Sequence, residues 1–147
     1  MPPRNPWESY RRIATQTAPP GQLILMLYDG AIRSLEQALR GFGSDDPATA
    51  NATIHNGVQR TVEIVRELNY SLNMEKGGEC AATLRRLYDY FERRLFESNL
   101  RKERTGIEEV LRHLNTLRDA WATMLTNQTF APASDPLRPP AVAAASP

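Results

Sequence analysis

Residues 22–40 read QLILMLYDGAIRSLEQALR, and this stretch decides the fold. Its apolar positions recur at alternating intervals of four and three residues, continuing just past the stretch: Ile24, Tyr28, Ala31, Leu35, Ala38 and Phe42. That spacing places them on one face of an α-helix. The first turns carry further apolar residues on other faces: Leu23, Leu25, Met26 and Leu27. A surface helix needs only one apolar face, so this helix must also contact a second element or a partner.

Three later segments carry the same periodicity, and short turns that contain glycine or proline separate them. The first of them begins at Asp46, a favourable N-cap, with Pro47 at the first helical position. The next begins near Glu79, after the helix break expected at Gly77–Gly78. The last begins at Thr105, which is expected to act as an N-cap and has Glu108 at capping-box spacing.

Four long amphipathic helices joined by short turns predict an all-α fold, an antiparallel four-helix bundle. A short amphipathic segment at residues 6–17 is expected to add an extra N-terminal helix, which is too short to be stable without a surface to cover. Residues 1–125 should form the helical-bundle domain. Residues 126–147 are rich in Ala, Pro and Ser and should form a disordered tail.

Composition excludes several classes of protein. The chain of 147 residues suits one domain, and its net charge of +1, from 18 basic and 17 acidic residues, gives no sign of nucleic-acid binding. The single Cys80 fits a reducing compartment. The N-terminus has no apolar segment typical of a secretory signal, and no stretch approaches the ~18 apolar residues of a membrane span. We therefore expect a cytoplasmic protein without membrane insertion.

Residues that could support enzyme chemistry are few. His55 and His113 each lack a second ligand at metal-binding spacing within their turn, apart from the unremarkable pair of Glu109 with His113. We expect no catalytic residue, no cofactor and no metal, and hence no enzyme. One face of the third long helix alternates in charge every four residues, which predicts pairing along a solvated surface: Arg85, Asp89, Arg93, Glu97 and Arg101.

Several motifs occur in the order found in a known family. They are TQTAP at residues 15–19, LILMLYDGAI at 23–32, SLNMEKGGE at 71–79, LYDY at 87–90, RRL at 93–95 and LRDAW at 117–121. Together with Tyr10 and Asn99, they make the chain similar, over residues 7–124, to the FliS family of flagellin export chaperones. The resemblance implies a partner, the disordered C-terminal segment of flagellin, which is held unpolymerised in the bacterial cytoplasm. It also implies contact with a component of the membrane export gate.

Periodicity alone leaves open whether the surplus apolar residues fill the core only or also form a partner groove. With the resemblance, we predict a flagellin-binding groove and nominate six residues: Leu23, Leu27, Tyr28, Asn73, Tyr88 and Leu95. Tyr10 and Ile13 are predicted to cover this groove as a removable N-terminal cap. The alternative function is a regulatory bundle that binds another flagellar partner, such as an anti-sigma factor. The sequence is compatible with a homodimer as well as a monomer.

Overall fold

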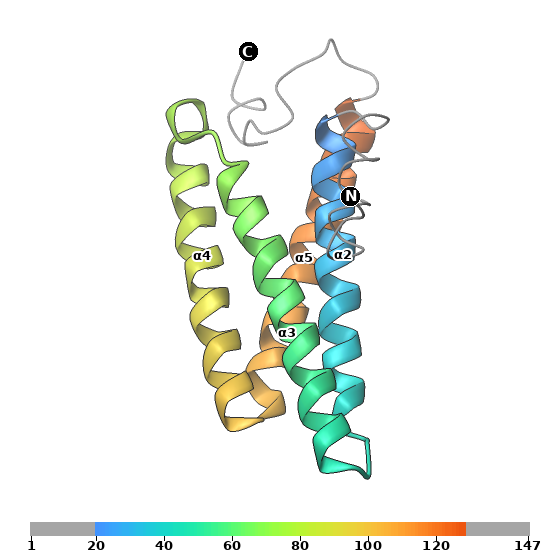
Figure 1. The fold of residues 1–147 in the computed structure, drawn as a ribbon. Coiled ribbons are helices and arrows are strands. Elements are labelled where there is room, and N and C mark those ends of the chain that lie inside the picture. The colour runs from blue at the N-terminus through green and yellow to red at the C-terminus, as the bar shows by residue number, and fades with distance from the viewer. Residues whose placement is uncertain (1–19, 129–147) are drawn as a thin grey trace, which may run out of the picture.

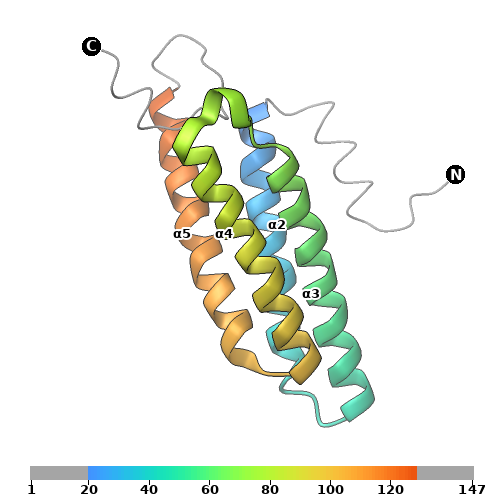
Figure 2. The same cartoon turned by 90° about the vertical axis from the view of Figure 1, so that its left-hand side faces the viewer.

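The computed structural model describes residues 20–128, which form four α-helices: α2 (Pro20–Gly41), α3 (Pro47–Tyr70), α4 (Met74–Arg101) and α5 (Arg104–Gln128). Each helix packs against the next, and α5 packs back against α2, so the four surround one core (Figures 1 and 2). Residues 20–128 contain no strand, which confirms the predicted four-helix bundle. The expected N-terminal helix, with Tyr10 and Ile13, lies outside the described residues.

The core is built from the predicted apolar stripes. All four helices contribute side chains that are almost completely buried; the largest are Tyr88, Phe91, Leu35, Ile64, Leu68, Leu95, Ile107 and Leu114. The apolar stripe that the sequence spacing predicts for α4 consists of Leu84, Leu87, Tyr88, Phe91, Leu95 and Leu100. Leu100 is exposed, however, and Ser98 occupies the inward position instead. The change follows from geometry, because Gly106 brings the start of α5 so close that a Cβ at that glycine would collide with Ser98 Oγ.

The first two helices begin much as the sequence predicts. α2 starts two residues earlier than expected, since Pro20 is tolerated in a first helical turn. Asp46 is the N-cap of α3, with its Oδ2 accepting hydrogen bonds from Thr49 N (3.2 Å) and Thr49 Oγ1 (2.5 Å). These hydrogen bonds hold the pKa of the Asp46 carboxyl below its usual value. The predicted cap is therefore confirmed.

Asn56–Gly57 would signal a hairpin between two strands, but here it lies inside α3, in keeping with the helical spacing of the residues around it. Gly57 is buried against α2, and a Cβ at this position would lie 2.7 Å from both the Ser34 carbonyl oxygen and Ala38 Cβ. The missing side chain therefore lets the backbones of α2 and α3 approach closely. Thr61, one turn later, is also buried on this seam and donates to the Gly57 carbonyl over 2.9 Å.

The start of α4 differs from the prediction in detail. The helix begins at Met74, not near Glu79, because Asn73 acts as an N-cap whose Oδ1 accepts the Lys76 N–H over 3.0 Å. Helical geometry then breaks at Gly78, whose φ of 55° and ψ of −137° favour glycine. The predicted break is confirmed, with one helical turn preceding it.

The start of α5 was predicted wrongly. The helix begins at Arg104, and Thr105 lies inside its first turn rather than acting as the N-cap. Lys102 ends α4 in the left-handed conformation, and Glu103 N–H bonds back to Ser98 O over 3.0 Å, so almost no chain separates the two helices. At its other end α5 continues to Gln128, so Thr126–Gln128 are helical and do not belong to the expected tail.

Candidate partner-binding site

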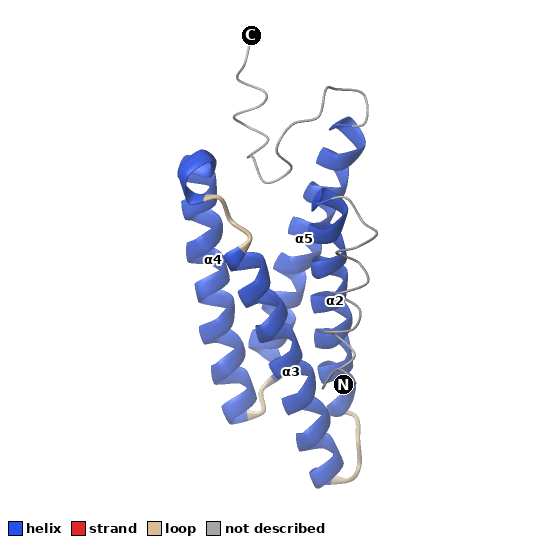
Figure 3. Ribbon diagram, turned by 45° about the horizontal axis from the view of Figure 1, so that its top comes forward, coloured by secondary structure: helices blue, strands red, loops and turns tan. Residues whose placement is uncertain are grey.

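One end of the bundle carries most of the partly exposed apolar side chains. It is the end where α3 joins α4, where α2 begins and where α5 finishes; we call it the α3–α4 end. There the α3–α4 pair of helices spreads away from the α2–α5 pair (Figures 1 and 3). The partly exposed apolar residues of this end are Leu23, Leu25, Met26, Leu72, Leu84, Leu87, Leu117, Trp121 and Leu125.

Two further apolar side chains at the α3–α4 end are largely exposed. Tyr70, the last residue of α3, is 85% exposed, and Met74, the first residue of α4, is 38% exposed. An exposed apolar surface of this kind is a candidate surface for a binding partner. The end of the bundle therefore offers more apolar surface than its own packing uses.

Beneath this surface lies a buried pair of tyrosines. The hydroxyl oxygens of Tyr28 in α2 and Tyr88 in α4 are 2.5 Å apart and share a hydrogen bond. Burial raises the pKa of the Tyr28 hydroxyl to about 12 and raises the pKa of the Tyr88 hydroxyl as well. Both side chains remain neutral at physiological pH, and each keeps a polar atom within an apolar core.

The nominated residues fall into three environments. Leu23 is partly exposed on the first turn of α2, at the α3–α4 end. Asn73 lies at the same end, where its side chain caps α4. The other four are buried in the core: Leu27, Tyr28, Tyr88 and Leu95. The structure therefore places Leu23 and Asn73 on the surface and Tyr28 and Tyr88 below it, whereas Leu95 lies about two helical turns further along α4.

Polar contacts tie α5 to α2 beside the same end. Trp121 Nε1 donates to the Gly21 carbonyl over 2.8 Å, and Arg118 Nε pairs with Asp29 Oδ1 over 2.9 Å. The carboxylate of Asp29 raises the pKa of the Arg118 guanidinium. These contacts fix the first turns of α2 against the last turns of α5. One side of the apolar surface is thereby held in place.

The sequence did not predict a second apolar feature, a groove between α3 and α4. It has a volume of about 470 Å³, with Val58, Val62 and Phe96 among its apolar lining and Arg66 paired to Glu92 on its rim over 2.9 Å. Phe96 is 66% exposed. In the sequence, the only sign of this groove was that Phe96 lies off the main apolar stripe of α4. That sign is weak, because an isolated exposed aromatic residue is common on protein surfaces.

The charged face of α4 pairs differently from the prediction. Instead of bonding only along its own helix, Arg85 donates to Asn69 Oδ1 of α3 over 3.2 Å, and Asn69 Nδ2 donates to Asp89 Oδ1 over 3.1 Å. An amide of the neighbouring helix thus links two charges that are four residues apart. The alternating charges therefore also fasten α4 to α3.

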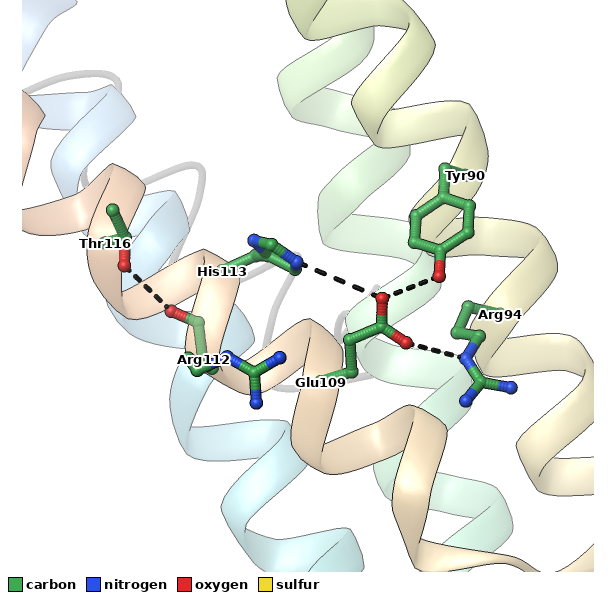
Figure 4. Close-up of polar contacts among 6 residues, drawn as sticks. All are labelled: Tyr90, Arg94, Glu109, Arg112, His113 and Thr116. Atoms are coloured by element: carbon green, nitrogen blue, oxygen red, sulfur yellow. Dashed lines mark hydrogen bonds and ion pairs between the residues drawn. The ribbon is translucent and has the colours of Figure 1, made fainter.

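A polar cluster joins α4 to α5 on the other side (Figure 4). The Glu109 carboxylate accepts a hydrogen bond from Tyr90 Oη over 2.6 Å and pairs with Arg94 Nε over 2.8 Å. His113 Nε2 lies 4.0 Å from the same carboxylate, and its ring stacks on Phe91. The hydrogen bonds from Tyr90 and Arg94 lower the pKa of Glu109. This cluster joins α4 to α5 through polar contacts.

Substituting Glu109 tests that role through pH. Because the folded protein lowers the pKa of Glu109, the carboxylate stabilises the fold above its ordinary pKa, and this contribution is lost as pH falls through the lowered value. Urea unfolding should therefore show Glu109→Gln less stable than the parent at pH 7, with the difference shrinking below about pH 4. Glu108→Gln, on the exposed face, is the matched control and should change little at either pH. A difference that did not depend on pH would contradict the prediction.

Within residues 20–128 no three His, Cys, Asp or Glu side chains come together in an arrangement that could hold a metal ion. In the same part of the chain, none of the helices has the length and apolar character needed to cross a membrane. The candidate site is the exposed and partly exposed apolar surface at the α3–α4 end of the bundle.

Comparison with known proteins identifies the family. A family model described as flagellar protein FliS matches residues 3–128. The chain belongs to the FliS family. The flagellar secretion chaperone FliS of Bacillus subtilis is 30% identical over 125 residues, covering 85% of this chain and 90% of that protein. Its counterpart in Salmonella typhimurium is 37% identical over 118 residues, covering 80% of this chain and 84% of that protein.

FliS membership confirms the resemblance read from the sequence motifs and makes this chain a flagellar secretion chaperone by family. The match also spans residues 3–19, which precede the described bundle. The α3–α4 end carries residues from four of the family-like motifs: LILMLYDGAI, SLNMEKGGE, LYDY and LRDAW. The apolar surface and the family signature therefore coincide in the structure.

Proposed function

We propose that this chain binds the disordered C-terminal segment of flagellin in the bacterial cytoplasm and keeps flagellin from polymerising before export. The observation that supports the proposal is the exposed apolar surface of the α3–α4 end in a chain of the FliS family. A client segment that orders on binding loses conformational entropy, so its affinity depends on burying a large apolar area. The exposed Tyr70 and Met74 and the partly exposed leucines supply such an area.

In this proposal the six nominated residues divide into surface contacts and buried support. Leu23 and Asn73 lie at the surface, where a bound segment would reach them. Leu27, Tyr28 and Tyr88 form the floor below the surface, and Leu95 supports it from within α4. The chain acts by binding, without catalysis, and passes its client to a component of the export gate. A homodimer is compatible with this proposal.

Titration calorimetry tests the proposal. A peptide of the last ~40 residues of the host's flagellin, a length suited to several helices in grooves, should bind the purified chain at one site. Leu23→Asp should weaken binding at least about tenfold, since a carboxylate would be buried against apolar client surface. Gln22→Asp, on the exposed side of the same turn, is the matched control and should bind normally. If the parent chain did not bind the peptide, the proposal of flagellin binding would be refuted.

The N-terminal cap is a separate prediction. Tyr10 and Ile13 are proposed to cover the apolar surface in the free protein and to leave when the client binds. A cap that must leave first lowers the apparent affinity by its own docking free energy. The double substitution to alanine should therefore raise binding of a hydrophobic dye and leave client affinity equal or tighter. Much weaker client binding by a folded double variant would show that the two residues contact the client directly, and the cap would be abandoned.

A further inference from the structure

Tyr28 and Tyr88 come from helices that are not neighbours in the bundle. α2 packs against α3 and α5, and α4 packs against the same two helices, so α2 and α4 face each other across the diagonal. The two rings extend inward from opposite sides until their hydroxyl oxygens lie 2.5 Å apart. Both side chains are buried, so this contact forms in the middle of the core.

The two hydroxyls restrict how the helices around them can pack, in addition to any stabilisation that they provide. A buried hydroxyl that loses its partner costs about 1–3 kcal/mol, whereas two phenylalanines would fill similar space with no polar atom to satisfy. Each hydroxyl therefore requires the other at hydrogen-bonding distance. A buried polar pair of this kind restricts how the surrounding helices can pack. Here the restricted quantity is the separation of α2 and α4.

The helices spread apart at the α3–α4 end (Figures 1 and 3). The tyrosine pair lies below that end, with Tyr88 near the middle of α4. One turn before Tyr28 on α2 lies Leu25, and one turn before Tyr88 on α4 lies Leu84. Both leucines are partly exposed and belong to the apolar surface. The hydrogen bond thus joins the two helices that carry opposite sides of that surface.

We propose that the Tyr28–Tyr88 hydroxyl pair is a positioning element that fixes the separation of α2 and α4 and so shapes the apolar surface for its client. The inference rests on the proposed function for its consequence, but the positioning itself is a property of the free protein. In this role the hydroxyls act through the helices they join and do not contact the client. Loss of either hydroxyl breaks the hydrogen bond, so loss of the second should cause no further weakening.

Hydrogen exchange of the full chain tests the positioning directly. Tyr88→Phe keeps the ring and removes the hydroxyl, and amides near Leu25 and Leu84 should then exchange faster than in the parent. Tyr90→Phe is the matched control, since it removes a hydroxyl two residues away that bonds to Glu109 on the α5 side. It should leave exchange at the α3–α4 end unchanged. Unaltered exchange in Tyr88→Phe would overturn the proposal whether or not flagellin binds.

Client titration then tests the consequence. Tyr28→Phe and Tyr88→Phe should each weaken binding of the flagellin peptide by up to about tenfold, the worth of one hydrogen bond, and the double variant should be no weaker than either single variant. Tyr90→Phe should bind like the parent. Additive losses would show that the hydroxyls act separately, and normal binding by Tyr88→Phe would show that the spacing does not matter; either result overturns the proposal. A parent chain that binds no peptide would instead refute the proposed function.

Discussion

Replacing Leu95 by alanine is expected to lower the free energy of unfolding by about 2–5 kcal/mol. Leu95 is fully buried in the last third of α4, so the shortened side chain loses apolar burial and leaves a cavity. The loss is large relative to the total stability of about 5–15 kcal/mol that single domains possess. Urea unfolding followed by circular dichroism at 222 nm measures it, using the conventional wavelength for helix.

Leu100→Ala is the matched control, because Leu100 lies on the same helix but is 73% exposed. Its substitution should change stability by no more than about 0.5 kcal/mol. Equal effects at the two positions would mean that Leu95 is not a core residue. The Leu95→Ala and Leu100→Ala variants also help interpret client binding. A weaker affinity of Leu95→Ala for the client must be compared with its loss of stability.

A second large effect is expected from Gly57→Ala. Alanine gains about 1 kcal/mol of helix propensity over glycine, but the new methyl group would meet α2 at distances that force the helices apart. Overpacking of this kind typically costs about 1–3 kcal/mol, so the gain should be offset or exceeded. The measured free energy of unfolding should therefore fall, against the trend for a glycine inside a helix.

Asn56→Ala provides the comparison for Gly57→Ala. Asn56 is the preceding residue of α3 and is exposed, so alanine there should be neutral or slightly stabilising. If Gly57→Ala were more stable than the parent, α2 and α3 would not be in the close contact described. Melting temperatures of the two variants, measured side by side, distinguish these outcomes.

Periodicity predicted the fold because the stripes of α2, α3 and α5 point to one side at nearly every position. Ile24, Leu35 and Leu114 all lie where that pattern puts them. The N-cap Asp46 and the break at Gly78 were also predictable, because the chemistry of single residues determines them. These features need only the sequence spacing and the conformational preferences of single residues.

Other features depend on contacts between distant residues. The exposure of Leu100 follows from the approach of Gly106 to Ser98, which brings two helices together and has no local signal. The same holds for the nominated client residues, because an apolar stripe does not say which of its members the other helices cover. Tyr28 and Tyr88 were nominated for a surface but lie below it, paired with each other.

The seam between α2 and α5 differs from the others in the distance it spans along the chain. Its hydrogen bonds join residues 100 and 89 positions apart, whereas the remaining seams join consecutive helices. Closing so long a loop costs more conformational entropy, and contacts between distant residues slow folding. Helical hairpins can form from local contacts, but the ring of helices closes only when α5 reaches α2. The α2–α5 seam is therefore expected to form in the last step of folding.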